Sequence, residues 1–315
     1  MNWYSHKKKT IFKWFVLPWI VAFFVIAISI NLLNVSGEGL KPFVSLSEVS
    51  PDELYELDVK RSISEGVSKD ENMPLFSDMK SDTGILLIHG FTGTPYEMQN
   101  LSSFLNEKGY STYSVRLPGS GTNIENMNRF EYKDWYDSLK YGYFALKNSC
   151  ENVYIVGQSL GGLLASVTGY YNDVKGIALL NPAIRIKDWK FRFVPVVQLF
   201  KNEYRKEDFD ESRKDYYYDA WPVKGMYQLY LLQKYIINNI YEYNSHLLLV
   251  QAKNDDTVDY RGVLRYFEKL DAISKKRILI SDEDVSHVLT LDDNPKRGFV
   301  FEAISNWIRE TNNAQ

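Results

Sequence analysis

The sequence predicts an α/β fold with a mostly parallel, doubly wound sheet that is covered by helices on both faces. Apolar runs of strand length alternate with amphipathic segments of helix length from about residue 84 to residue 308. Such alternation is typical of parallel βαβ units. The apolar runs are nearly continuous, as expected for strands that are buried on both faces. One of the runs leads directly into a Gly-x-Ser-x-Gly motif centred on Ser159.

The predicted elements follow the hydrophobic pattern in chain order. Strands are expected at residues 85–88, 112–116, 153–156, 176–180, 247–251 and 277–280. Helices are expected where apolar residues recur every three or four positions. These helices are residues 96–108, with Met98, Leu101 and Leu105 on one face; residues 132–147; and residues 296–309, with Phe299, Ile304, Trp307 and Ile308 toward the sheet.

Residues 184–245 interrupt this alternation. More than sixty residues without a clear strand pattern separate Pro182 from His246. An insertion of this length inside a compact domain is usually a functional lid. We therefore predict a helical cap over Ser159 that ends in a helix at residues 226–238. Its many aromatic side chains, between Trp189 and Tyr243, either pack the cap or line a pocket for an acyl group.

The N-terminal part predicts a membrane anchor. Residues 14–33 form a stretch of 20 residues without a charge, and Lys7, Lys8, Lys9 and Lys13 precede it. About 20 apolar residues in a helix cross a bilayer, and the flanking lysines favour the cytoplasmic side. We expect a single-pass protein with a cytoplasmic basic tail at residues 1–13 and the catalytic domain outside the cytoplasm. The alternative is a signal peptide, cleaved near residues 35–37, and a secreted protein.

Two further segments complete the predicted organisation. Residues 34–80 are mixed, polar and acidic, with scattered Ser, Pro and Gly. They predict a tether that lifts the domain off the membrane, with a short helix at residues 51–57. Residues 81–315 then form the catalytic domain, with the cap at residues 184–245 inserted in it.

Ser159 is the candidate nucleophile. It lies where an apolar strand meets a sharp turn and a helix, the context that lifts a serine hydroxyl out of the fold. Gly157 and Gly161 flank it at a spacing at which side chains would collide across the turn. The motif thus has a steric reason as well as a chemical one.

A serine hydroxyl needs a base to take its proton, and an acid must orient that base. In folds of this class the chain order is serine, acid, histidine. Of the four histidines, only His246 and His287 follow Ser159. His246 opens an apolar run and is expected to begin a strand, whereas His287 follows the last predicted strand on a loop. Catalytic groups gather at such loops, so His287 is the predicted base.

The predicted acid lies on the loop after the strand at residues 247–251. Three carboxylates compete there: Asp255, Asp256 and Asp259. Asp255 is favoured, because a strand-end turn would first aim its side chain back toward the histidine. Asp256 is the alternative, and Asp259 is expected to cap a helix or face solvent.

Four motifs of the chain look like those of α/β-hydrolases, and most like those of small bacterial carboxylesterases and monoacylglycerol lipases. They are residues 86–94, 157–162, 254–255 and 286–292. The resemblance covers roughly residues 84–308 and implies an α/β-hydrolase fold and ester hydrolysis, without specifying a substrate. The chain departs from the family at residues 117–122, a loop that usually carries histidine where this chain has Ser120.

Ester hydrolysis also requires backbone N–H groups that hold the negative charge on the carbonyl oxygen. One donor is expected from Leu160, directly after Ser159 at a helix N-terminus. The other is expected from Phe91, on the loop after the first strong strand. Gly90 and Gly93 would set the backbone path of that loop. His89 beside it is expected to be a packing residue.

Composition limits the remaining function classes. The 315 residues carry a net charge of −3, without a basic stretch in the predicted domain that would suggest nucleic acid as a partner. The single cysteine, Cys150, allows no intramolecular disulfide and belongs to no metal-ligand pattern. No metal or organic cofactor is expected. The predicted activity is that of a membrane-anchored serine carboxylesterase or lipase acting on a small-molecule or lipid ester.

Two other functions remain open. An acyltransferase or thioesterase would use the same three residues, and a catalytically inactive hydrolase fold could serve as a binding module. Epoxide and haloalkane hydrolysis are disfavoured, because those relatives have a carboxylate where this chain has Ser159.

Overall fold

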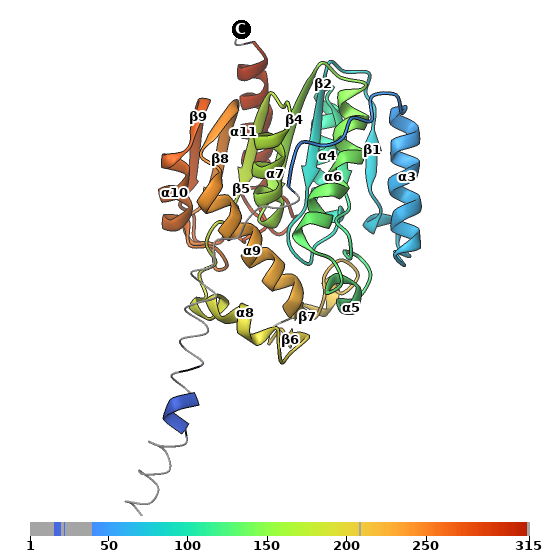
Figure 1. Cartoon of the computed structure of the whole chain (residues 1–315). Coiled ribbons are helices and arrows are strands. Elements are labelled where there is room, and N and C mark those ends of the chain that lie inside the picture. Colours follow the sequence, from blue (N-terminus) through green and yellow to red (C-terminus); the bar gives the residue numbers. More distant parts are fainter. Residues whose placement is uncertain (1–15, 20–21, 23–39, 208, 314–315) are drawn as a thin grey trace, which may run out of the picture.

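A seven-stranded sheet forms the centre of the computed structural model, which describes residues 16–19, 22, 40–207 and 209–313. The strands lie in the order β1-β3-β2-β4-β5-β8-β9 (Figure 1). All neighbouring pairs are parallel except β1 and β3, which are antiparallel. The bounds are β1 Leu75–Ser77, β2 Thr83–Ile88, β3 Ser111–Val115, β4 Asn152–Gln158, β5 Gly176–Leu180, β8 Glu242–Ala252 and β9 Asp271–Ile280.

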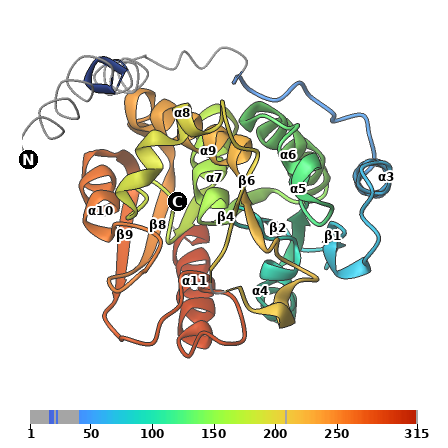
Figure 2. The ribbon, with the colours of Figure 1, turned by 90° about the horizontal axis from the view of Figure 1, so that it is seen from below.

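Helices cover both faces of this sheet, and each face has its own apolar core (Figure 2). On one face lie α4 (Tyr96–Glu107) and α11 (Arg297–Asn312). On the other lie α6 (Tyr132–Lys147), α7 (Leu160–Tyr171), α9 (Val223–Asn239) and α10 (Tyr260–Lys269). The doubly wound, mostly parallel α/β architecture that the sequence predicts is therefore confirmed.

All six predicted strands and the predicted helices are present, with differences at their ends. The strands β8 and β9 begin earlier than the apolar runs, because their first residues are polar or exposed. β1 has only three residues, too few for a periodic pattern, and the sequence did not reveal it. Met98, Leu101 and Leu105 are fully buried as predicted. In α11, Ile304, Trp307 and Ile308 are buried, but Phe299 is 55% exposed, so its predicted orientation is wrong.

Residues 40–80, which the sequence predicts as a tether, pack against the edge of the domain. The predicted short helix extends over α3 (Pro51–Ser64), capped by the Ser50 side chain. It packs beside α6 and buries Leu54 and Asp58. The Asp58 carboxylate accepts hydrogen bonds from Arg61 and, at 3.0 Å, from the Tyr113 hydroxyl of β3. A short 3₁₀ helix (Asp70–Asn72) then leads into β1.

The predicted tail at residues 1–13 and all of the predicted anchor except residues 16–19 and 22 lie outside the described residues. In the part of the chain that is described, no helix has the length and apolar character needed to cross a bilayer.

The cap lies across the ends of β4, β5 and β8, at the bottom of Figure 1. It is less helical than predicted. Beside α9 it contains a two-stranded antiparallel sheet of β6 and β7, and residues 242–245 belong to β8. Strands of three residues, such as these two, are too short to give a periodic pattern in the sequence, so they were not predicted. The cap elements before α9 are η3 (Trp189–Phe193), α8 (Val194–Val197), β6 (Glu203–Arg205), η4 (Glu211–Arg213) and β7 (Ala220–Pro222).

Candidate active site

Ser159 lies at the turn between the central strand β4 and helix α7. Its backbone has φ 55° and ψ −111°, a region that residues with a side chain rarely adopt. The turn is held in place because the Ser159 N–H donates to Leu180 O at 2.9 Å and the Ser159 carbonyl accepts from Ala183 N at 3.1 Å. The neighbouring strand β5 thus fixes the strained conformation of the predicted nucleophile.

The two motif glycines are required by close backbone approaches. A Cβ atom at Gly157 would lie 2.1 Å from the carbonyl oxygen of Gly161, and a Cβ at Gly161 would lie 2.1 Å from that of Ile88. Both neighbours are main chain and cannot move aside. The predicted steric role of these glycines is confirmed.

Asp255 and His287 are brought together at the same edge of the sheet. His287 Nδ1 lies 2.7 Å from Asp255 Oδ2. The other oxygen, Oδ1, accepts two backbone hydrogen bonds of 2.8 Å, from Thr257 and Val258. Asp255 is 1% exposed, so its carboxylate is held from both sides in a buried position.

The competing side chains do not contact His287. Asp256 also lines the cavity, but it is exposed and accepts a hydrogen bond from the Thr257 hydroxyl instead. Asp259 caps α10 by accepting from the backbone of Arg261, which is one of the roles predicted for it. His246 is inside β8, and its Nδ1 contacts the Ser274 hydroxyl at 2.8 Å.

The loop that carries His287 is fixed by two buried amides. Gln158, directly before Ser159, donates to His287 O at 2.9 Å and accepts from Leu289 N at 3.1 Å. Asn181, at the end of β5, donates to the same carbonyl at 2.7 Å. Sequence reasoning missed both residues. Their positions at the carboxyl ends of strands β4 and β5 are the signal that could have found them.

A cavity of about 720 Å³ opens beneath the cap, and Ser159, His287 and Phe91 all line it. Among the described residues, no hydrogen bond joins the Ser159 hydroxyl to the ring of His287. The cap contributes most of the apolar wall. Its lining side chains include Phe191, Val194, Val197, Phe209, Trp221 and Met226.

This geometry agrees with comparisons to known proteins. A family model described as serine aminopeptidase, S33 (Hydrolase_4) matches residues 80–294. The chain belongs to this family, and thus to the α/β-hydrolase superfamily. The resemblance inferred from the four motifs is thereby confirmed.

Two curated relatives are similar to this hydrolase in sequence. A carboxylesterase of Bacillus subtilis (strain 168) is 28% identical over 224 residues, which are 69% of this chain and 89% of the relative. A thermostable monoacylglycerol lipase of Bacillus sp. (strain H-257) is 39% identical over 104 residues, 33% of this chain and 42% of the relative.

Solved structures share the fold of this hydrolase. A structure from work on the metagenome-derived lipolytic enzymes LipS and LipT aligns with a TM-score of 0.69 and 23% identity, over 76% of this chain and 98% of the other. A soluble variant of monoglyceride lipase from Saccharomyces cerevisiae aligns with a TM-score of 0.60 and 13% identity, over 73% of this chain and 87% of the other.

Of the two predicted oxyanion donors, Leu160 follows Ser159 directly in the chain, and Phe91 lines the same cavity as Ser159. Leu160 is the first residue of α7, and Phe91 lies on the loop after β2. Within the described part of the hydrolase, neither backbone N–H donates a hydrogen bond to another group. The Phe91 ring lies parallel to that of Trp221, with centroids 6.3 Å apart, so the cap packs on this loop.

His89 joins two loops at this edge and does not reach the cavity lining. Its Nδ1 donates to Gly90 O at 2.8 Å, and its Nε2 accepts from Leu117 N at 3.2 Å. Only a neutral ring can make both bonds. Burial lowers the pKa of His89 from 6.5 to about 4. The predicted packing role fits this arrangement.

Glu97 is a buried carboxyl group in the cavity wall that sequence reasoning missed. Its Oε2 accepts from Gly90 N at 2.6 Å, and its Oε1 accepts from the Tyr217 hydroxyl of the cap at 2.7 Å. Burial raises its pKa. Lys206 also lines the cavity, and burial lowers its pKa to about 8; its ammonium lies 4.2 Å from the centroid of the Trp221 ring. Glu97 thus connects the loop of Phe91 to the cap.

The loop that departs from the family pattern is tightly held. Ser120 is fully buried, and its hydroxyl has no hydrogen-bond partner in the described part of the chain. Its carbonyl accepts from the buried Arg116 guanidinium at 3.0 Å. Tyr218 of the cap donates its hydroxyl to Gly119 O in the same loop. The loop therefore contacts the cap and helps to hold it in place. Ser120 is not among the residues that line the cavity.

Proposed function

We propose that this α/β-hydrolase hydrolyses carboxylic esters through a covalent acyl-enzyme formed on Ser159. The main support is that the strained Ser159 and His287, which is held by the buried Asp255, line one cavity. The curated carboxylesterase and monoacylglycerol lipase relatives support ester substrates.

The proton path follows from the hydrogen bonds of His287. Its Nδ1–H donates to Asp255, so Nε2 carries the lone pair that accepts the Ser159 proton. The serine oxygen then bonds to the ester carbonyl carbon, and the carbonyl oxygen becomes an oxyanion. His287 returns the proton to the departing alcohol oxygen. A water molecule, activated by the same Nε2, attacks the acyl-enzyme and releases the acid and Ser159.

The oxyanion is assigned to the backbone N–H groups of Phe91 and Leu160. Both lack another acceptor within the described residues, and Leu160 opens a helix, where N–H groups favour negative charge. One such donor contributes about 2.7–4 kcal/mol of transition-state stabilisation in serine hydrolases. Because the donors are main-chain groups, the path of the loop matters more than its side chains.

The cavity favours an acyl chain of substantial size. Its volume of about 720 Å³ lies in the range of pockets for drug-sized ligands. Its cap wall is mostly apolar and aromatic, which suits a hydrocarbon chain, and charged side chains such as Glu97 and Lys206 line other parts of it. We therefore include lipid esters such as monoacylglycerols among the proposed substrates.

We also propose that residues 14–33 anchor the protein in a membrane, with the catalytic domain outside the cytoplasm. The support is the 20-residue uncharged stretch after four lysines. A secreted protein with a cleaved signal peptide is the alternative, and the N-terminal sequence of the mature protein distinguishes the two.

A fluorophosphonate probe tests the central proposal. We expect it to label the full chain at Ser159, and the labelled protein to lose hydrolysis of p-nitrophenyl esters. Ser159→Ala should abolish both labelling and hydrolysis, with a near-UV circular dichroism spectrum like that of the parent. Labelling at another residue, or hydrolysis that survives Ser159→Ala, would contradict it. Absence of both reactions in the folded parent would indicate a binding module.

Substrate competition distinguishes the related activities. We expect water to be the main acceptor, so that added alcohols do not divert the acyl group. Efficient ester formation with an alcohol would indicate acyl transfer, and a strong preference for thioesters over oxygen esters would indicate a thioesterase.

A further inference from the structure

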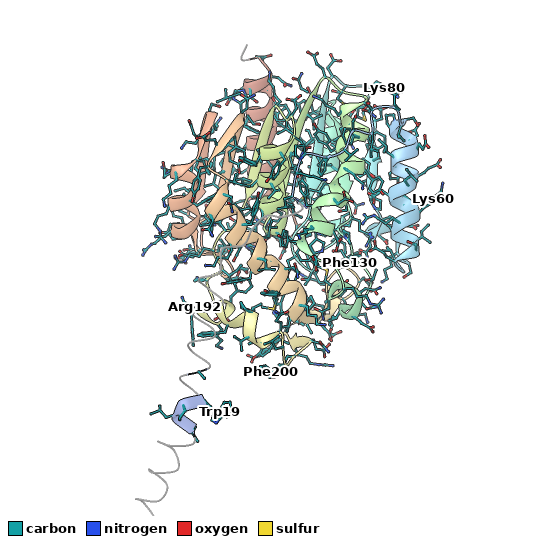
Figure 3. All side chains as sticks on the ribbon, viewed as in Figure 1. Trp19, Lys60, Lys80, Phe130, Arg192 and Phe200 are labelled. Atoms are coloured by element: carbon teal, nitrogen blue, oxygen red, sulfur yellow. The ribbon has the colours of Figure 1, made fainter. Side chains whose placement is uncertain are left out.

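The cap carries three large apolar side chains that are turned to solvent. Trp189 is 61% exposed, Leu199 66% and Phe200 80%. We call these three residues the apolar tip. They lie on the short segment that runs through η3 and α8, at the end of the molecule where Figure 3 labels Phe200 and Arg192. Exposing such groups to water is unfavourable by roughly 25 cal/mol per Å².

The clustering of the tip distinguishes it from other exposed apolar residues. Ile63, Ile273 and Phe299 are exposed to a similar degree, at 58%, 59% and 55%, but they lie on α3, β9 and α11 respectively. Single exposed apolar residues are common on soluble proteins. Three large exposed apolar side chains within twelve residues of one cap segment indicate a surface that binds a partner.

The net charge of the segment that carries the tip indicates which partner. Residues 187–205 contain five Lys or Arg and two Asp or Glu, a net charge of +3, although the whole chain has −3. Trp and Phe beside Lys and Arg are the residue types that bind the interface of an anionic bilayer. A second copy of this chain, meeting the first tip to tip, would bring a second segment of charge +3 against it, which disfavours that contact.

The same segment also forms the wall of the cavity. Phe191, Val194 and Val197 face the cavity that Ser159 lines, and Tyr204 follows on β6. Inner wall and outer tip thus alternate along one short stretch of chain. A lipid leaving a membrane in contact with the tip would therefore meet apolar side chains of the same segment in the wall of the cavity that Ser159 lines.

We propose that the apolar tip docks the cap on an anionic lipid surface, so that the cavity opens toward the membrane. The contact with lipid depends only on this surface. Its purpose, delivery of an ester lipid to Ser159, rests on the proposed function.

The docking is tested on the full chain with a local probe. Residues 14–33 would bind vesicles by themselves, so the readout is the environment of one site instead of total binding. An environment-sensitive fluorophore is attached at Asn202→Cys, an exposed position beside the tip, in a Cys150→Ala, Ser159→Ala background. The matched control carries the label at Lys60→Cys, on the exposed face of α3 (Figure 3).

We expect vesicles of phosphatidylcholine and phosphatidylglycerol to shift the emission of the label at position 202 to the blue and to leave that at position 60 unchanged. Vesicles of phosphatidylcholine alone, or high salt, should give a smaller shift. Equal responses at the two sites, or none at position 202, would overturn the proposal. A shift at position 202 that grows with protein concentration without vesicles would show self-association and would also overturn it.

A second measurement concerns delivery. In the active full chain, Leu199→Ser/Phe200→Ser should lower the hydrolysis rate of a long-chain ester in anionic vesicles about tenfold. Hydrolysis of a soluble short-chain ester should change less than about twofold, because neither residue lines the cavity. Ile63→Ser/Phe299→Ser is the matched control and should change neither rate. An equal loss on both substrates, or no loss on vesicles, would overturn the delivery role. Absence of activity in the parent would contradict the proposed function and leave the probe result valid.

Discussion

The catalytic edge of the sheet and the cap above it are built in opposite ways. At the edge, Asp255 and Ser159 are 1% and 7% exposed, and main-chain hydrogen bonds hold them in place. In the cap, the part before α9 consists of three-residue strands, single turns of helix and connecting turns, and the turn after α8 leaves Phe200 80% exposed. The sheet therefore fixes the positions of the groups that would react. The entrance to the cavity is formed by short cap elements that are more exposed.

The two regions are joined at a few polar contacts. Glu97 accepts from Gly90 of the core and from Tyr217 of the cap, and Tyr218 of the cap donates to the loop at Gly119. These contacts position the cap over the cavity. Since the cap acts on the site only through such contacts, changes in the cap should reduce catalysis less than changes at the edge, where the candidate catalytic residues lie.

The largest effect is expected from Asp255→Asn. The amide cannot hold His287 in the tautomer with Nδ1–H, so kcat for a p-nitrophenyl ester should fall about 10⁴-fold. Asp256→Asn is the matched control, since Asp256 is exposed and does not contact His287. It should stay within about twofold of the parent. Similar losses in the two variants would contradict the assignment of the acid.

A smaller effect, on stability, is expected from protonating His89. Its pKa is lowered from 6.5 to about 4 in the folded protein, so the unfolded chain binds more protons between these values. The free energy of unfolding should therefore fall by about 3 kcal/mol as the pH is lowered from 6.5 to 4. Stability falls with falling pH because the folded state keeps the His89 ring neutral, whereas the unfolded chain takes up a proton.

The measurement is urea unfolding across this pH range for the parent and His89→Asn. The variant should be less stable at neutral pH, where it loses two hydrogen bonds, but its stability should depend less on pH. His246, whose pKa burial also lowers, contributes to the slope in both proteins. Equal slopes in the parent and the variant would show that His89 is not the titrating group.

The smallest effect is expected from Tyr217→Phe, which removes the cap's hydrogen bond to Glu97. Leaving the buried carboxyl oxygen without this donor should lower the free energy of unfolding by about 1–3 kcal/mol. Because the reacting groups are untouched, KM should rise more than kcat falls. Tyr216→Phe is the control, since the Tyr216 ring stacks on Tyr96 and keeps this contact as Phe. A large loss of kcat with unchanged KM would place Tyr217 in the chemical step.

Parts of the fold and site could be predicted because their physical cause is local. Continuous apolar runs marked six of the seven strands, and periodic apolar residues marked α4 and α6. The Gly-x-Ser-x-Gly spacing marked Ser159, since a Cβ at either glycine would meet a backbone carbonyl at 2.1 Å. His287 followed from its place after the last strand. These signals need only a few neighbouring residues.

Other parts depend on contacts that neighbouring residues do not reveal. β1 forms because β3 offers an edge to pair with, and β6 and β7 form because they pair with each other. Gln158, Asn181 and Glu97 look like ordinary polar residues in the sequence, and their roles arise from partners up to 131 positions away.

The amino-acid sequence by itself determined the layered α/β architecture and the strand ends at which Ser159, the candidate carboxylates and His287 lie. Both follow from short-range patterns of burial and backbone sterics. Only the tertiary structure shows that Asp255, and not Asp256, turns inward and contacts His287. It also decided which cap side chains line the cavity and which face solvent, because that division depends on packing across the whole domain.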